Sequence, residues 1–327
     1  MRTFSRRNYL KLALGSFIIS LTGFSHAQDN YPNKPIKLVF PLAAGTGGDM
    51  IARVVAEAMS PILGQAVIVE NRVGAGGVIG TDYVAKSPAD GYTLVLGTIG
   101  AIILNPELNP NVTYKVSRDF APIAYLGHTG FVVVTAPQSG IQSLGELIGR
   151  LKQGNGNFSS VGAGTALHLA TELFLKRAQV KATHIPYRGS SQSLTDVASG
   201  EVMFTLETPA AALPLIKAGK LRALAVTTTN RMASLPAVPS VKESGLPDYE
   251  ATAWWGMLAP AGTPPAVIKK LSDAAVTAVN QSNVKDRFAG MGAEASPLPA
   301  PEFAKVIERD RPLWGQLIKE LDLKTGS

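Results

Sequence analysis

Residues 39–50, VFPLAAGTGGDM, decide the fold, because a hydrophobic run breaks into glycines just before a helical pattern. The overlapping segment 36–40, IKLVF, is typical of a strand. Gly64 lies where a glycine commonly ends a helix. The apolar residues between them recur at the spacing of an amphipathic helix: Ile51, Val54, Val55, Ala58, Met59 and Ile62. A turn of this kind holds a nucleotide, holds another anion, or merely bends the chain.

Strand and helix patterns alternate along the rest of the chain. Further strands are predicted at 66–70 and 92–96, with a helix at 77–86 between them. The second half continues with strands predicted at 131–134, 202–206 and 221–226, a helix at 144–152, and the further segments 157–161 and 184–187. Alternation of this kind indicates an α/β fold in which helices cover a mostly parallel sheet.

A second glycine turn follows a strand in the second half. The segment 161–168, VGAGTALH, leads into a helix that contains Leu169, Leu173 and Phe174. Ligands of open α/β sheets bind beyond the carboxyl ends of the strands. Two such sheets that face each other predict a ligand cleft between two domains.

The glycine turns do not match the known nucleotide motifs. The dinucleotide pattern G-x-G-x-x-G fails from Gly45, where position 50 is Met50, and from Gly74, where position 79 is Ile79. The Gly219–Lys220 pair lacks the other residues of a phosphate-binding loop. Glycines still allow close approach of the backbone, and a helix N-terminus offers unpaired N–H groups and a partial positive charge. The turns therefore suit a small anion, carboxylate as well as phosphate, although glycines also occur in purely structural turns.

The candidate ligand-binding positions lie mainly in these two turns. They supply backbone N–H groups and short polar side chains: Ala44, Gly45, Thr46, Gly47, Gly48, Asp49, Gly162, Ala163, Gly164 and Thr165. The presence of two turns in one α/β chain favours a binding role over a purely structural one.

Single polar side chains leave two interpretations open in each case. Asp49 caps its helix, or it holds the loop open or contacts a ligand amine. Thr98 donates a hydrogen bond to a ligand or satisfies its own turn. His168 caps its helix or reaches a ligand, and Arg188 pairs with a carboxylate or is solvated. The Trp254–Trp255 pair favours core or hinge packing over an aromatic stacking platform.

Composition excludes several classes of protein. The chain of 327 residues is 46% hydrophobic and has no cysteine, which excludes disulfides and thiolate metal sites. No basic run is interleaved with aromatic residues, so we expect no nucleic-acid partner. The G-x-S-x-G and H-E-x-x-H motifs are absent, and the histidines lack metal-ligand spacing. The sequence therefore predicts a protein that is not an enzyme, with no catalytic residue, metal or cofactor.

The N-terminus resembles an export signal. Residues 4–11, FSRRNYLK, contain paired arginines, the apolar run 10–24 follows, and Ser25, His26 and Ala27 precede the predicted cleavage site. The arginine pair is similar to a twin-arginine signal, and an ordinary secretory signal is the alternative. Four of the 31 basic and none of the 24 acidic side chains precede Gln28, which leaves a net charge of +3 on the mature chain. We expect cleavage near Ala27 and a periplasmic protein.

Several segments together resemble the extracytoplasmic solute-binding proteins of tripartite tricarboxylate transporters, the Bug or TctC family. The resemblance covers essentially the whole mature chain and is carried by YPNKPIKLVFP with AGTGGD, VENRVGAGGVIGTDYVAKSPADGYTL, VGAGTALHLATELF, HIPYRGSSQSLTDVASGEV, IKAGKLRALAVTTTNR, LPAVPSVKESGLPDYEATAWWGMLAPAGTP and EFAKVIERDRPLW. The first turn departs from the family pattern, which usually reads Pro-Phe-x-x-Gly-Gly-like, because here it reads Pro41-Leu42-Ala43-Ala44-Gly45.

The resemblance implies a two-domain clamshell of the type II periplasmic-binding-protein kind, crossed twice by the chain. Domain 1 would comprise residues 28–125 and 250–327, and domain 2 residues 126–249. It further implies a ligand carboxylate held between the loops 45–49 and 162–168, partly through water, with hinge closure.

The function implied is that of a monomeric periplasmic receptor that delivers a small carboxylate to the membrane subunits of a tripartite tricarboxylate transporter. The ligand class includes di- and tricarboxylates, acidic amino acids and aromatic carboxylates. A sensor subunit for the same ligands is one alternative, and a secreted α/β enzyme that acts on a small organic acid is another.

Overall fold

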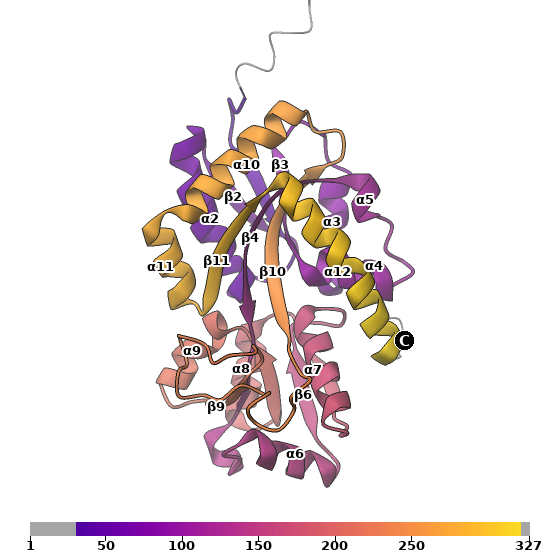
Figure 1. The fold of residues 1–327 in the computed structure, drawn as a ribbon, viewed down its shortest axis with the longest axis vertical. Helices are drawn as coiled ribbons and strands as arrows, with labels where there is room; N and C mark the ends of the chain where they lie inside the picture. Colours follow the sequence, from indigo (N-terminus) through magenta and orange to yellow (C-terminus); the bar gives the residue numbers. More distant parts are fainter. Residues whose placement is uncertain (1–30, 322–327) are drawn as a thin grey trace, which may run out of the picture.

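The computed structural model of the protein describes residues 31–321. The predicted signal peptide, residues 1–27, lies outside the described residues. Figure 1 shows an elongated molecule with two groups of strands, one above the other, each surrounded by helices. A six-stranded sheet forms the centre of the first lobe, and a five-stranded sheet forms the centre of the second lobe.

The sheet of the first lobe has the strand order β11-β4-β10-β3-β1-β2. β1 is parallel to β2 and β3, whereas β10 is antiparallel to β3 and β4, and β11 is antiparallel to β4. Its strands are β1 (Ile36–Phe40), β2 (Val67–Asn71), β3 (Thr93–Thr98), β4 (Phe120–Gly130), β10 (Thr252–Pro260) and β11 (Ala293–Pro299).

The sheet of the second lobe has the strand order β7-β6-β8-β5-β9. β6 is parallel to β7 and β8, and β5 is antiparallel to β8 and β9. Its strands are β5 (Val132–Thr135), β6 (Asn157–Ser160), β7 (Thr183–Pro186), β8 (Phe204–Glu207) and β9 (Arg222–Val226).

The two-lobed α/β fold is confirmed, but both sheets are mixed and not mostly parallel. In the first lobe, every antiparallel pair contains β4 or β10. These are the strands that lead out of this lobe and back into it, so they run in opposite directions (Figure 1). β4 continues through Phe131 into β5, which carries the outgoing direction into the second sheet.

The segments that cross between the sheets are tied together at Thr227. The N–H of Phe131 donates to Thr227 Oγ1 at 2.7 Å, and the N–H of Thr227 donates to the Phe131 carbonyl oxygen at 2.9 Å. The N–H of Ala251, just before β10, donates to the Thr227 carbonyl oxygen at 3.0 Å. We retain the division into domains 28–125 with 250–327 and 126–249 as a proposal.

Helices cover both sheets (Figure 1). In the first lobe they are α2 (Gly47–Leu63), η1 (Ala75–Gly77), α3 (Val78–Ala85), η2 (Gly100–Leu104), α4 (Asn105–Leu108), α5 (Val116–Asp119), α10 (Pro265–Asn280), α11 (Ser282–Gly290) and α12 (Ala300–Leu321). In the second lobe they are η3 (Pro137–Ser139), α6 (Leu144–Lys152), α7 (Ala166–Arg177), α8 (Ser190–Ser199) and α9 (Pro209–Lys217).

Helix α2 follows from its sequence pattern. Ile51, Val55 and Met59 are fully buried, as the apolar spacing predicts, whereas Ile62 near the end of the helix is exposed. Gly64 ends the helix with φ 68°, in the left-handed region that favours glycine. This helix therefore places its N-terminus, and with it the first glycine turn, at the end of β1.

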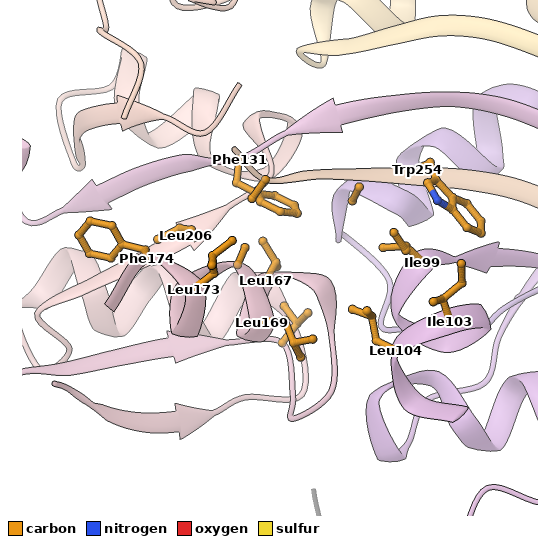
Figure 2. Packing of buried hydrophobic residues seen from close by; sticks show 14 of the residues in the cluster. Ile99, Ile103, Leu104, Phe131, Leu167, Leu169, Leu173, Phe174, Leu206 and Trp254 are labelled. Carbon is orange, nitrogen blue, oxygen red and sulfur yellow. The ribbon is translucent and has the colours of Figure 1, made fainter. Parts of the chain in front are cut away.

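Apolar packing continues from one lobe to the other. Figure 2 shows Ile99 and Leu104 of the first lobe on one side and Leu167 and Phe131 on the side of the second lobe. All belong to one cluster of buried residues. The lobes therefore contact each other through apolar side chains in this conformation.

Candidate functional site

The first glycine turn leaves the N-terminus of α2 without a side-chain cap. Thr46 occupies the N-cap position, but its hydroxyl donates to the Ala43 carbonyl oxygen at 2.9 Å and accepts no helix N–H. Gly47 and Gly48 begin the helix, and both line a cavity between the lobes. Because helix-initial N–H groups need an acceptor, this end of α2 is suited to an anion.

Asp49 stabilises the turn from behind. Its carboxylate accepts from the N–H of Gly45 at 3.0 Å, from Asn71 Nδ2 at 2.9 Å, and from Arg53 at 3.0 and 3.1 Å. Burial raises the pKa of Asp49, but the hydrogen bonds from Arg53, Asn71 and Gly45 together hold that pKa below its usual value. The side chain is nearly fully buried, so the structure places it in the role of holding the loop.

The second turn places the N-terminus of α7 opposite that of α2. Thr165 is the N-cap residue, and its hydroxyl donates to the Gly162 carbonyl oxygen at 2.7 Å and accepts weakly from the N–H of His168 at 3.4 Å. Thr165, Ala166 and Leu167 line the same cavity as Gly47 and Gly48. One glycine turn from each lobe therefore contributes to the wall of one cavity.

His168 supports the second turn. Its Nδ1 accepts from the N–H of Gly164 at 3.2 Å, and its ring stacks on that of His184 with centroids 4.1 Å apart. The Nε2 of His184 lies 2.7 Å from Ser160 Oγ. Burial, aided by the nearby His168, lowers the pKa of His184 to about 4. Both rings lie behind the turn, outside the wall of the cavity.

The cavity has an apolar wall. Its volume is about 50 Å³, and it lies where β1, β3, β6 and β8 end. That is room for roughly three or four water molecules, so a larger ligand requires the lobes to separate. The apolar wall consists of Phe40, Leu42, Phe131, Val161, Ala166, Leu167, Ala253 and Trp255.

Polar groups line the cavity from both lobes. They are Thr46, Thr98, Thr165, Ser190, Glu207 and Thr208. The hydroxyl of Thr98 accepts from the N–H of Ala101 at 3.3 Å, so it partly satisfies its own turn. Among the described residues that line the cavity, Glu207 is the only charged type, and no lysine, arginine or histidine is present.

Three polar lining residues were not predicted from the sequence. Ser190 is the first residue of α8, Thr208 is the N-cap residue of α9, and Glu207 is the last residue of β8. The N-termini of α8 and α9, like that of α2, lack a side-chain cap. The order Glu207-Thr208-Pro209 was a usable signal, because proline favours the first turn of a helix and a preceding strand end points to a ligand edge.

The predicted site residues divide into three sets, of which Asp49 and His168, described above, support the turns. Thr46, Gly47, Gly48, Thr98 and Thr165 line the cavity. The tips of the turns and Arg188 lie outside its wall: Ala44, Gly45, Gly162, Ala163, Gly164 and Arg188. Their role in binding stays a prediction.

The tips of the turns instead contact the opposite lobe. Asn105 Nδ2 in the first lobe donates to the Gly164 carbonyl oxygen at 3.3 Å, and to the carbonyl oxygens of Gly76 at 3.0 Å and Gly100 at 3.2 Å. Gly76 packs so closely that a Cβ there would lie 2.4 Å from the Ala163 carbonyl oxygen. The lobes are therefore closed upon each other around the cavity.

The other features of the described residues do not favour a different candidate site. A larger, open groove of about 540 Å³ lies beside the crossing segments, lined by residues such as His128, Met232 and Glu294, and neither glycine turn reaches it. Within residues 31–321, no group of three metal-ligating acidic or histidine side chains is present. No helix in the same range is long and apolar enough to cross a membrane.

Two α/β lobes that close around a small cavity, with a helix N-terminus from each lobe directed at it, define a two-lobed solute-binding protein. Residues 51–323 match the family described as tripartite tricarboxylate transporter family receptor, TctC, and the chain belongs to this family.

Relatives of known sequence and structure agree with this assignment. Protein BugT of Bordetella pertussis is 36% identical over 318 residues, which cover 96% of this chain and 98% of BugT. The structure of the periplasmic binding protein BugD has a TM-score of 0.87 and 30% identity, covering 90% of this chain and 100% of BugD. An R. palustris protein solved with adipate has a TM-score of 0.87 and 31% identity, covering 90% of this chain and 99% of the other.

Proposed function

We propose that this protein is a periplasmic receptor that captures a small carboxylate between its lobes and delivers it to a tripartite tricarboxylate transporter. One observation carries the proposal. The uncapped N-terminus of α2 and the N-terminus of α7 come from different lobes and line one cavity. The adipate bound to the R. palustris relative supports a carboxylate as the class of ligand.

The geometry supports capture by closure of the lobes. A carboxylate that accepts hydrogen bonds from Gly47 or Gly48 in one lobe and from Ala166 or Leu167 in the other binds both lobes only when they are closed. The closed state is therefore stabilised by the ligand, which shifts the population toward it. A membrane subunit that recognises the closed form would then receive loaded receptor in preference to empty receptor.

The chemistry of the cavity supports binding without turnover. Its wall offers N–H groups, hydroxyls and one carboxyl group, and no described lining residue pairs a nucleophile with a histidine. We propose that the protein is a monomer that needs no cofactor and acts in the periplasm after cleavage near Ala27.

Thermal unfolding of the mature protein with a panel of acids tests the proposal. The panel contains mono-, di- and tricarboxylates, adipate among them, and the methyl esters of the same acids serve as matched uncharged controls. At a ligand concentration of 100 times Kd, we expect about 2.7 kcal/mol of stabilisation. A folded sample that is stabilised by none of the acids, or equally by the esters, contradicts the proposal.

A second measurement separates receptor from enzyme. The protein is incubated with the acid that stabilises it, and the mixture is analysed by mass spectrometry. We expect the acid to be recovered unchanged, whereas a product that accumulates with time would show catalysis.

A further inference from the structure

We propose that Glu207 is a specificity-determining residue of the cavity, and that its carboxyl group stays protonated and donates a hydrogen bond to an oxygen of the bound acid. The inference rests on the proposed carboxylate-binding function and identifies a side chain that recognises the ligand. It predicts a ligand group that accepts a hydrogen bond at this point, and it argues against an ammonium group there.

Glu207 is a buried residue in the wall of the cavity. It is 1% exposed, ends β8 and lines the cavity. Its Oε1 accepts from the N–H of Thr208 at 2.7 Å and from the Thr208 hydroxyl at 3.0 Å. Both of these hydrogen bonds are made by Oε1, which leaves Oε2 to carry the proton.

A second polar group at the same place also lacks a partner. Ser190 is 2% exposed and lines the cavity beside the Glu207 carboxyl group. Its Oγ is near enough to the Glu207 carboxyl group to lower the pKa of that group, but it forms no hydrogen bond of normal geometry with any described residue. Buried hydroxyls are nearly always hydrogen-bonded, so an unpartnered one in a cavity wall indicates a position that a ligand fills. Ser190 and Glu207 thus mark one polar end of the cavity.

No cation balances a charge on Glu207. The flanking strands β5 and β6 carry no titratable residue. The other elements packed nearby carry Asp49, Arg53 and Glu57 on α2, His168, Glu172, Lys176 and Arg177 on α7, Asp196 on α8 and Lys217 on α9. None of these side chains lines the cavity. Burial raises the pKa of Glu207, the groups of Thr208 and Ser190 beside its carboxyl group oppose this rise, and no charged group contributes to the shift.

A carboxylate ligand strengthens the argument. Two ionised carboxylates cannot share a small, desolvated site, and such pairs hold one proton between them. The helix N-termini favour the negative charge on the ligand, so the proton belongs on Glu207. Protonated Glu207 then donates from one oxygen and accepts from Thr208 with the other. The carboxyl groups of Glu207 and the ligand therefore hold one proton and one negative charge between them.

The ligand-free protein provides the first test, by comparison of wild type with Glu207→Gln. A raised folded-state pKa means that wild type loses stability as the pH rises from the unfolded value of about 4.3 toward the folded-state pKa. Glu207→Gln lacks this loss, so we expect its Tm to gain on that of wild type as the pH rises. A Tm difference that is constant or that moves the other way overturns the assignment of a protonated carboxyl group.

Ligand binding provides the second test, with adipate as the probe in isothermal titration at pH 6. Gln retains a donor at this position and Leu does not. We expect Glu207→Gln to bind within about threefold of wild type, and Glu207→Leu to bind roughly tenfold more weakly. A Gln variant as weak as the Leu variant would show that an ionised carboxylate is required, and a Leu variant as tight as wild type would show no hydrogen bond at all.

The two tests also separate this inference from the proposed function. If adipate and every other acid of the panel fail to bind, the carboxylate-receptor function is contradicted, whereas the ligand-free comparison still decides whether Glu207 is protonated. If the acids bind and the variants behave otherwise than stated, the function stands and the role of Glu207 is overturned.

Discussion

At the residue scale, the carboxylate of Asp49 holds the loop before α2 by accepting from the N–H of Gly45, while neither Asp49 nor Thr46 caps an N–H group of the helix. Its interactions with Arg53 and Asn71 fix the carboxylate in place while the helix N–H groups stay free. A negative side chain near a helix N-terminus also stabilises the helix electrostatically. The loop is thus held in shape without use of the N–H groups that a ligand would need.

Asp49→Asn tests this role. Because hydrogen bonds to charged groups contribute roughly 1.5–3 kcal/mol, we expect a loss of about 2 kcal/mol in the free energy of unfolding at neutral pH. The folded-state pKa lies below the unfolded value of about 3.9, so the stabilisation exists above that pH and is lost as the pH falls through the folded-state pKa. Urea unfolding from pH 7 to pH 2 should show wild type and variant converging at low pH, and parallel curves would contradict the account.

A second residue-scale prediction concerns His184. Its pKa of about 4 means that the ring is neutral in the folded protein at neutral pH. The unfolded chain takes up this proton near pH 6.5, so stability is lost as the pH falls from about 6.5 to about 4. NMR titration of the imidazole, assigned with His184→Asn, should give a midpoint near the lower value. A midpoint near 6.5 would show that the ring is solvated.

At the element scale, the N-termini of four helices surround the cavity. Gly47 of α2 lies so close to α9 that a Cβ there would be 2.6 Å from Thr208 Oγ1 across the lobes. Its backbone is that of an ordinary helix residue, so the reason for glycine is this close approach. The contact is made only when the lobes are closed, so we expect glycine at position 47 to permit closure.

Gly47→Ala therefore separates folding from closure. Alanine favours a helix over glycine by about 1 kcal/mol, so the variant should fold, but its methyl group should hinder closure and weaken binding of the acid at least tenfold. Gly149→Ala in α6 is the matched control, because a Cβ there meets nothing within 4 Å. The control should keep the affinity of wild type. Equal affinity of both variants in calorimetry would contradict a role for close approach.

The elements that the sequence predicts are those with a simple local pattern. Helices α2, α6 and α7 and the short apolar strands follow from apolar spacing and from glycine at helix ends. Strands β4, β10 and β11 were missed because their partners are distant in sequence and their runs contain proline or glycine: Pro122, Gly256, Pro260 and Pro297. These strands make the first sheet mixed, and only tertiary pairing reveals them.

The same physical limit applies to the site. The glycine turns are local signals, so the positions of Thr46, Gly47, Gly48 and Thr165 in the cavity wall could be predicted. Ser190 and Glu207 become neighbours only after α8 and β8 pack together, and no local pattern records that contact. Trp254 and Trp255 are both buried in β10, as predicted for core packing, and Trp255 also lines the cavity.

At the scale of the whole molecule, polar contacts across the cleft contribute to the closed state. Asn105 binds Gly164 of the other lobe, and Glu320 of α12 pairs with Arg177 of α7 at 2.9 Å. The second pair is exposed and contributes little. Asn105 is buried in the first lobe, so loss of its hydrogen bond to Gly164 should shift the equilibrium from the closed form toward the open form.

Asn105→Ala tests the contribution of this contact. Loss of one hydrogen bond across the lobes of about 1 kcal/mol corresponds to roughly a fivefold change in the ratio of closed to open protein. We expect a larger radius of gyration in small-angle X-ray scattering without ligand, and a return to the wild-type value with saturating acid. Asn283→Ala on the exposed face of α11 is the control and should leave the radius unchanged. An unchanged radius for Asn105→Ala would show that other contacts decide closure.

The most direct measurement of the central claim is a crystal structure of the protein with a bound carboxylic acid. The account predicts carboxylate oxygens about 3 Å from the N–H groups of Gly47 or Gly48 in one lobe and of Ala166 or Leu167 in the other. An acid found in the open groove beside the crossing segments, or bound by one lobe alone, would contradict it.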